Sequence, residues 1–222
     1  MTVADSLPEV LLFDLDGTLV DTAPDLARAT NALRAYHGLA ALPYPVIRAQ
    51  VSNGGSALVT LALGLEREHA GHAEARTYLL AAYGEAVAVD SRVFPPLDRL
   101  LVEWERRDGT WGIVTNKPRA YAEPLVSALG LTPGALLCAD DLAEKKPSPL
   151  PLLTAAGQLG TPPARCWYIG DHLRDMQAAR AAGMVAVAVG YGYLEEEDDH
   201  RQWPADLWFD TAEALSDALL EA

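Results

Sequence analysis

Two aspartates separated by one residue follow a short apolar run near the N-terminus. The segment reads LLFDLDGTLVDT, so Asp14 and Asp16 come directly after Val10 to Phe13. In an extended chain, residues i and i+2 point to the same side, so both carboxylates can address one reacting group. A carboxylate can act as a nucleophile or move a proton. Two acids this close are costly unless a cation or a proton compensates them, so the pair predicts a reactive site in preference to a surface turn.

Three later segments also carry polar residues near the ends of apolar runs. They contain Thr115 and Asn116, then Lys146 before Pro147, then Asp171 within the sequence IGDHLRD. Taken alone, a threonine in this position is typical of a helix cap. In open α/β sheets, however, ligands bind at the carboxyl ends of the strands. These segments would therefore meet the aspartate pair at one edge of a sheet.

The elements that position these residues follow from an alternation of apolar runs and helical patterns. The runs predict buried parallel strands at Trp111 to Val114, Ala135 to Cys138, Cys166 to Ile169 and Val185 to Val189. Repeated strand–helix alternation implies right-handed crossovers and helices on both faces of the sheet. The predicted fold class is therefore α/β with an open, doubly wound parallel sheet, in which Val10 to Phe13 forms the first strand.

The stretch from residue 20 to residue 90 breaks this rhythm. It carries helical stripes of apolar residues and no convincing buried strand. We therefore expect a catalytic α/β core formed by residues 1–19 and 91–222, with residues 20–90 inserted as a helical cap after the first strand. The loop Asn53-Gly54-Gly55 is expected to point from this insertion into the site.

In combination, DLDGT, a later threonine, a later lysine and a late GDxxxD resemble the haloacid dehalogenase superfamily of phosphotransferases. The motifs cover the whole catalytic core in the family's order. The resemblance implies a Rossmann-like core with an inserted helical cap. It also implies a magnesium-dependent phosphatase that hydrolyses a small-molecule phosphate monoester.

The resemblance assigns roles to the motif residues. Asp14 would attack phosphorus and form an aspartyl-phosphate. Asp16 would protonate the leaving alkoxide and then activate water. The Thr115 hydroxyl and the Asn116 backbone N–H would bind the phosphoryl oxygens, and Lys146 would offset their charge. These residues make up the predicted catalytic and phosphate-binding set.

By the same resemblance, Asp171 would bind Mg²⁺ together with the Asp14 carboxylate and the Asp16 carbonyl oxygen. Asp175, one helical turn later, would orient the metal's waters or Lys146. Magnesium prefers oxygen ligands, so the adjacent histidine is expected to be a neighbour of the site and not a ligand.

Four further residues complete the predicted substrate site. Gly17 would let the backbone turn closely under the phosphate, and the N–H groups near Gly17 and Thr18 would donate to its oxygens. Asn53 and Gly54 would contact substrate from the cap. For Lys117, a surface position and a substrate contact are weighed evenly.

The substrate stays open between two related families. The segments DTAPDL, SNGG and VTNKP are similar to the phosphoglycolate phosphatases. The later segment GYGY, followed by Trp203, Ala205 and Asp206, is also similar to the N-acetylmuramic acid 6-phosphate phosphatases. Phosphoglycolate phosphatase-like is the first interpretation, and a sugar-acid phosphate is the alternative.

Other functions are less favoured. Sugar phosphomutases and phosphonate-cleaving relatives place a lysine in the cap, and the insertion here contains none. A phosphate-binding protein without catalysis would be expected to show a broken motif, and each motif is intact.

Composition and net charge limit the classes of partner that the protein is expected to bind. The chain has 17 basic and 31 acidic residues, a net charge of −14, which would repel nucleic acid and anionic membranes. No segment approaches the roughly 20 apolar residues that span a bilayer. We therefore expect a cytoplasmic monomer or homodimer whose partner is a small phosphate ester, with no nucleic-acid or membrane partner. Cys138 and Cys166 are expected to be reduced core residues, and the acidic run 195–199 a solvated loop.

Overall fold

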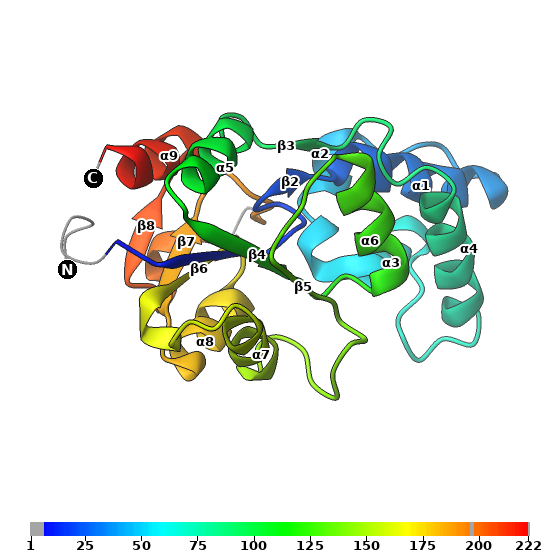
Figure 1. Ribbon diagram of the computed structural model, residues 1–222. Coiled ribbons are helices and arrows are strands. Elements are labelled where there is room, and N and C mark those ends of the chain that lie inside the picture. Colours follow the sequence, from blue (N-terminus) through cyan, green and yellow to red (C-terminus); the bar gives the residue numbers. More distant parts are fainter. Residues whose placement is uncertain (1–6, 196–197, 222) are drawn as a thin grey trace.

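A six-stranded parallel sheet forms the centre of the protein in the computed structural model, which describes residues 7–195 and 198–221. The strand order is β5-β4-β1-β6-β7-β8 (Figure 1). The strands are β1 (Val10–Phe13), β4 (Thr110–Val114), β5 (Ala135–Leu137), β6 (Cys166–Gly170), β7 (Val185–Val189) and β8 (Leu207–Phe209). The predicted α/β class and parallel sheet are confirmed.

The register of the central strands aligns their carboxyl ends. Phe13 at the end of β1 pairs with Ile113 of β4 on one side and with Ile169 of β6 on the other. The residues that follow these three strands therefore emerge next to one another at the same edge of the sheet.

Strand β1 is apolar on both faces because helices cover both sides of the sheet. Leu11 and Phe13 belong to one buried cluster, and Val10 and Leu12 belong to another. In Figure 1, α5 (Leu97–Arg106) and α9 (Ala212–Leu220) lie above the sheet, and α7 (Leu150–Gln158) and α8 (Leu173–Ala182) lie below it. The helices of the first cluster are α5, α6 (Arg119–Ala128) and α9; those of the second are α7 and α8. The sheet is thus doubly wound, as predicted.

A helical unit, residues 23–84, lies beside the sheet and is joined to it by two short antiparallel strands. Its entry strand is β2 (Val20–Asp21) and its exit strand is β3 (Arg92–Val93). The unit contains α1 (Ala23–Tyr36), α2 (Tyr44–Arg48), α3 (Gly54–Leu63) and α4 (His72–Gly84). Helix α1 packs on α3 and α4, and their apolar residues join the first cluster of the sheet. The division into a core and a cap at residues 20 and 90 stays a prediction.

Three single turns of 3-10 helix complete the described elements. They are η2 (Val51–Asn53), η3 (Pro163–Arg165) and η4 (His200–Gln202). The turn η2 lies within the helical unit between α2 and α3, and its residues line the same cavity as the motif residues of the sheet edge.

Both cysteines are buried and free, as predicted. Burial raises the pKa of the Cys138 thiol to about 12 and that of the Cys166 thiol to about 11. At neutral pH both are therefore protonated, and they contribute to the core as small apolar side chains.

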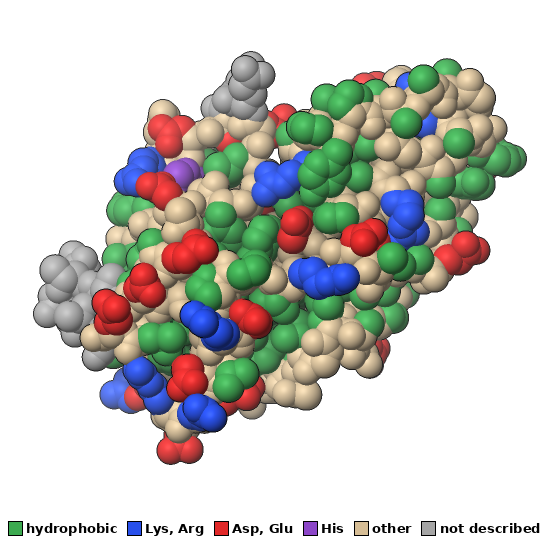
Figure 2. Space-filling model, turned by 90° about the horizontal axis from the view of Figure 1, so that it is seen from above, with side chains coloured by type: hydrophobic (Ala, Val, Ile, Leu, Met, Phe, Trp, Pro, Cys, Tyr) green, Lys and Arg blue, Asp and Glu red, His purple; other side chains and the backbone are tan. Residues whose placement is uncertain are grey.

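The surface mixes charges of both signs. Figure 2 shows acidic and basic side chains interspersed with hydrophobic ones on the face seen from above. Within the described residues, no helix combines the length and the apolar character needed to cross a membrane.

Candidate active site

The motif residues meet at the carboxyl edge of the sheet. Asp14 follows β1, Thr115 follows β4 and Asp171 follows β6, and these three strands are neighbours. Lys146 comes from the loop between β5 and α7. The fold therefore brings four motifs that are far apart in sequence to one place, as the position of sites in open α/β sheets leads us to expect.

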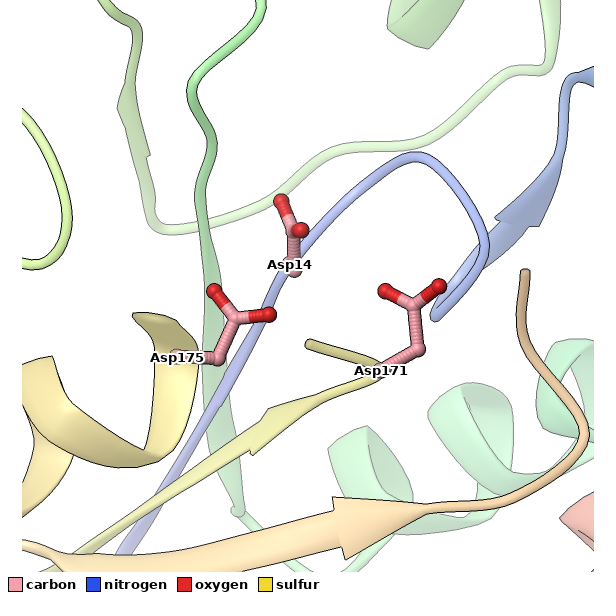
Figure 3. A group of neighbouring side chains, drawn as sticks. All are labelled: Asp14, Asp171 and Asp175. Carbon is pink, nitrogen blue, oxygen red and sulfur yellow. The ribbon is translucent and has the colours of Figure 1, made fainter. Parts of the chain in front are cut away.

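Three carboxylates gather at this edge. Asp14, Asp171 and Asp175 each offer an oxygen, and these oxygens lie within 4.8 Å of one another. Figure 3 shows the three side chains converging on a common space from the end of β1, the end of β6 and the first turn of α8. All three are buried, with 8%, 1% and 0% of their surfaces exposed. So much buried negative charge requires a compensating cation.

Asp171 is held by three hydrogen bonds. Thr18 Oγ1 donates to its Oδ1 at 2.9 Å, while Ser52 Oγ and the Tyr193 N–H donate to its Oδ2 at 3.0 and 2.9 Å. Burial, followed by the charges of Asp14 and Asp175, nevertheless raises the pKa of the Asp171 carboxyl to about 7. The hydrogen bonds fix the direction of the carboxylate but do not balance its charge.

Lys146 supplies one compensating charge. Its Nζ lies 2.9 Å from Asp14 Oδ1, 2.8 Å from Asp175 Oδ1 and 2.6 Å from the Tyr168 hydroxyl oxygen. Burial works to lower the pKa of Lys146, but the Asp14 and Asp175 charges outweigh it and raise that pKa. Lys146 therefore stays charged, and Asp175 makes one of the two contacts predicted for it.

The carboxylate group suits a hard divalent cation. Burial raises the pKa of Asp175 to about 6, although Lys146 works in the opposite direction. Both Asp175 oxygens are buried; Lys146 Nζ contacts Oδ1 at 2.8 Å, and Oδ2 accepts no hydrogen bond within the described part of the chain. One lysine against three buried carboxylates leaves excess negative charge, and carboxylate oxygens are the ligands that such cations prefer. The Asp16 side chain does not belong to this group of carboxylates. The metal contact predicted for Asp16 would be made by its backbone carbonyl oxygen and not by its side chain.

Asp16 pairs with Lys117. Lys117 Nζ lies 2.9 Å from Asp16 Oδ1 and 3.2 Å from Oδ2, and Thr22 Oγ1 donates to Oδ1 at 2.6 Å. Lys117 is buried beneath the ring of Tyr83, 4.5 Å from its centroid. Burial works to lower the pKa of Lys117, but the charges and hydrogen bonds of Asp16 and Tyr83 together outweigh it and raise that pKa. Lys117 is thus not a surface residue. It lines the cavity as an ion pair with Asp16, and its contact with substrate stays a prediction.

Thr115 and Asn116 occupy different positions. The buried Thr115 hydroxyl lines the cavity described below and accepts a hydrogen bond from the Lys117 N–H at 3.1 Å. The Asn116 side chain instead forms two hydrogen bonds with the backbone of Lys146, at 2.9 and 3.1 Å. Asn116 therefore fixes the segment that carries Lys146, and the phosphate contact of its N–H stays a prediction.

The Gly17 N–H is used within its own turn, and the phosphate contact predicted for the N–H groups near Gly17 and Thr18 stays a prediction. The Gly17 N–H donates to the Val20 carbonyl oxygen at 2.9 Å and closes the turn after β1. Gly17 has a φ of +82°, and a Cβ atom there would lie 2.3 Å from Asp171 Oδ2. Glycine is required because the backbone must approach Asp171 closely, and Thr18 contributes its hydroxyl to the same carboxylate.

A cavity of about 590 Å³ opens between the sheet edge and the helical unit. It is lined on one side by the predicted residues Asp14, Asp16, Thr115, Asn116 and Lys146, and on the other by Asn53 and Gly54. The loop Asn53-Gly54-Gly55 lines the cavity, as predicted. Its contact with substrate stays a prediction.

Hydrogen bonds join this loop to the core. Besides the Ser52 contact with Asp171, the Arg174 guanidinium donates to the Ser52 carbonyl oxygen. Asn53 Nδ2 donates to Glu195 Oε1 at 2.7 Å. Glu195 therefore contacts the helical unit, yet it is exposed, as are Asp198 and Asp199, in keeping with the predicted solvated loop. Residues 196 and 197 of the same run lie outside the described residues.

Sequence reasoning missed two tyrosines of the site. Tyr193 donates its N–H to Asp171, and its hydroxyl oxygen accepts from the N–H groups of Thr22 and Ala23 at 2.6 and 2.9 Å. Tyr168, inside β6, holds Lys146. No spacing rule connects either residue with its partner, because the contacts depend on how distant loops and strands are arranged.

Comparisons with known proteins agree with this geometry. The chain is 42% identical to an N-acetylmuramic acid 6-phosphate phosphatase of Pseudomonas aeruginosa, over 95% of this chain and 94% of that protein. It is 38% identical to a phosphoglycolate phosphatase of Xylella fastidiosa, over 96% and 93% of the two chains. The crystal structure of a predicted phosphoglycolate phosphatase from Haemophilus somnus matches with a TM-score of 0.84 and 27% identity, covering 97% and 98%. Residues 8–183 also match the family model of the haloacid dehalogenase-like hydrolases, and the chain belongs to that family.

Proposed function

We propose that the protein is a magnesium-dependent phosphatase that hydrolyses a small phosphate monoester through an aspartyl-phosphate on Asp14. The arrangement that carries the proposal is the contact between Lys146 and Asp14 inside a buried carboxylate group that opens on a cavity. The family membership and the two curated relatives support it.

In the first half of the reaction, an Asp14 oxygen attacks phosphorus while the bond from phosphorus to the ester oxygen breaks. Asp16, which lines the same cavity two residues later, gives its proton to the departing alkoxide. Lys146 and the Thr115 hydroxyl offset the charge on the remaining phosphoryl oxygens. The products are the alcohol and an aspartyl-phosphate.

In the second half, water attacks the phosphorus of the aspartyl-phosphate and Asp16 takes its proton. The acyl-phosphate bond breaks, inorganic phosphate leaves and the Asp14 carboxylate is restored. Asp14, Asp171 and the Asp16 carbonyl would hold the magnesium ion, with Asp175 beside them. When bound, the ion supplies charge neutralisation for the phosphoryl group.

The helical unit is proposed to act as a cap over this site. Residues 20–90 would exclude water when closed, and Asn53 and Gly54 would contact substrate. The hydrogen bonds of Ser52 and Asn53 to the core are consistent with a closed arrangement.

Two substrates are candidates, namely phosphoglycolate and N-acetylmuramic acid 6-phosphate. The cavity of about 590 Å³ favours the second. Sites of roughly 300–1,000 Å³ enclose ligands the size of a drug molecule, whereas phosphoglycolate has only two carbons. We therefore place the sugar-acid phosphate first as the substrate, which reverses the order drawn from sequence.

The test is phosphate release by the wild-type protein from both esters, with Mg²⁺ and with a chelator. Asp14→Asn should lower the rate by at least about 1,000-fold, because covalent attack is lost. Asp98→Asn on the exposed face of α5 is the matched control. Wild-type turnover by Asp14→Asn, or turnover unaffected by the chelator, would contradict the proposal.

The setting of this activity is also a proposal. We infer a cytoplasmic enzyme, monomeric or homodimeric, that has no nucleic-acid or membrane partner. The net charge of −14 supports this inference, because it repels polyanions.

A further inference from the structure

Positive side chains are concentrated in the cavity. Six cations line it, namely Arg67, Arg76, Lys117, Lys145, Lys146 and Arg174. Among the described residues that line it, Asp14 and Asp16 are the acids. The whole chain has 31 acidic and 17 basic residues, so basic residues outnumber acidic ones in the cavity lining although the chain as a whole is acidic. A wall of this sign attracts anions.

Three of these six cations have a partner among the described residues, and three, Lys145, Arg67 and Arg76, have none. Lys145 is exposed on the loop that carries Lys146, so the two arginines are the unpaired cations of the helical unit. Lys146 and Lys117 are balanced by Asp14, Asp175 and Asp16. The Arg174 guanidinium donates to a backbone carbonyl oxygen in the loop before α3. In contrast, no side-chain ion pair or hydrogen bond joins Arg67 or Arg76 to any other described residue. Their donors are available to a ligand.

Both arginines belong to the helical unit and not to the sheet edge. Arg76 lies on α4, and its Nε lies 3.8 Å from the position of a Cβ atom built on Gly55 in the first turn of α3. Arg67 lies between α3 and α4, at the boundary between this cavity and a neighbouring open hollow that it also lines. The two therefore face the cavity from the wall opposite the predicted phosphate site.

The predicted phosphate site has its own compensating charges. Lys146, the Thr115 hydroxyl and the metal ion would serve the phosphoryl group, so that group does not require the two arginines. Arg76 is half-buried in the cavity lining, and Arg67 is exposed at its rim, so both guanidinium groups can reach a ligand in the cavity. Guanidinium groups match the planar fork of a carboxylate with paired N–H donors. The remaining positive charge fits a second anionic group on the substrate.

We propose that Arg67 and Arg76 form a subsite that binds a carboxylate carried by the same molecule as the phosphate ester. The inference rests on the proposed phosphatase function. It assigns the substrate class as phosphorylated acids, and excludes neutral sugar phosphates as the preferred substrates. The two arginines are binding residues that position the ester, and the chemistry stays with Asp14 and Asp16.

A matched substrate pair tests the subsite. N-acetylmuramic acid 6-phosphate differs from N-acetylglucosamine 6-phosphate only by the ether that carries a carboxylate. The ratio of kcat/KM for the two esters should favour the acid in the wild type. Arg67→Gln and Arg76→Gln should each lower that ratio by roughly 10- to 100-fold, mainly through KM, because charge-assisted hydrogen bonds are lost.

A control variant and a conservative variant accompany these measurements. Arg99→Gln removes an exposed arginine of α5 that lies outside the cavity lining, and it should keep the wild-type ratio. Arg76→Lys keeps the charge without the planar fork and should restore only part of the ratio. Thermal unfolding of each variant shows whether it is folded.

Three results would overturn the proposal. They are a wild-type ratio near one, an equal loss for both esters in the arginine variants, and a preference for a sugar bisphosphate over the acid. Absence of phosphate release from every ester would instead contradict the proposed function. In that case, calorimetric binding of the two esters to Asp14→Asn decides the subsite, which is wrong if both bind equally.

Discussion

Lys146 Nζ lies 2.9 Å from Asp14 Oδ1 and 2.8 Å from Asp175 Oδ1, with 1% of the lysine side chain exposed. Two opposite unit charges at this separation attract each other by about 6 kcal/mol at an effective dielectric near 20. Lys146→Met should therefore lower kcat for phosphate release by at least about 100-fold. It should also lower the free energy of unfolding by about 3–5 kcal/mol, because buried carboxylates lose their partner.

Urea unfolding and phosphate-release assays measure both effects of Lys146→Met. Lys145→Met, at the exposed neighbouring position, should change the free energy of unfolding by less than about 0.5 kcal/mol. Equal stability of the two variants would show that Lys146 does not balance the carboxylates.

Metal should change how stability depends on pH. The folded pKa values of Asp171 and Asp175 are raised from 3.8 to about 7 and about 6, so the folded protein holds protons that the unfolded chain has lost. Without metal, the free energy of unfolding should therefore fall as pH rises from about 4 to about 7. Mg²⁺ should reduce this fall, because it stabilises the ionised carboxylates.

Urea titrations at pH 5 and pH 7.5, with Mg²⁺ or a chelator, measure the effect. Asp171→Asn should weaken both the fall with pH and the stabilisation by Mg²⁺. If Mg²⁺ stabilised Asp171→Asn as strongly as the wild type, Asp171 would not be a ligand.

The contact between Lys117 and Asp16 predicts coupled mutations. Removing either partner leaves a largely buried charge uncompensated, so Lys117→Met and Asp16→Asn should each cost about 1–3 kcal/mol of unfolding free energy. The double variant should cost less than the sum by at least about 1 kcal/mol. A double-mutant cycle from urea unfolding measures this term, and additive costs would show that the two side chains act independently.

Gly17 and Gly38 separate backbone strain from close contact. Both have positive φ, +82° and +70°, but only at Gly17 would a Cβ meet neighbours, with Asp171 Oδ2 at 2.3 Å. Gly38→Ala should cost about 1–2 kcal/mol from strain alone. Gly17→Ala should cost more and also remove the stabilisation by Mg²⁺, because Asp171 is displaced. Thermal unfolding with and without Mg²⁺ compares them, and equal behaviour would contradict the contact.

Asp25 should stabilise the exit from the helical unit. Its buried carboxylate accepts hydrogen bonds from the N–H groups of Asp90 and Ser91, the Ser91 hydroxyl at 2.7 Å and the Arg28 guanidinium at 2.7 Å. Burial works to raise the pKa of Asp25, but these donors outweigh it and lower that pKa below its ordinary 3.8. Its stabilisation is therefore present above pH 3.8 and lost as pH falls through the lowered pKa.

Asp25→Asn should accordingly cost about 2 kcal/mol at pH 7, and the difference from the wild type should shrink below pH 3.8. Urea unfolding at pH 7 and pH 3 tests this direction. A difference that grew on acidification would contradict the assignment.

Sequence by itself determined the sheet and the motif residues at its edge. The run Val10–Phe13 has the bounds of β1, because a strand buried on both faces must be apolar throughout. The short strand β8 was missed, since it has only three residues and its central Trp208 is 38% exposed. The equally short β5 was predicted because its residues continue into the apolar, buried Cys138.

Tertiary structure alone decided how the side chains of the site are paired. Lys117 meets Asp16 across 101 positions of chain, and Arg76 reaches the cavity only because α4 packs beside α3. The Gly17 N–H donates to the Val20 carbonyl oxygen within its own turn, although the DLDGT motif predicted that N–H groups near Gly17 bind phosphate. Spacing along the chain fixes which residues emerge at the sheet edge, whereas the packing of distant loops and helices fixes which charges they balance there.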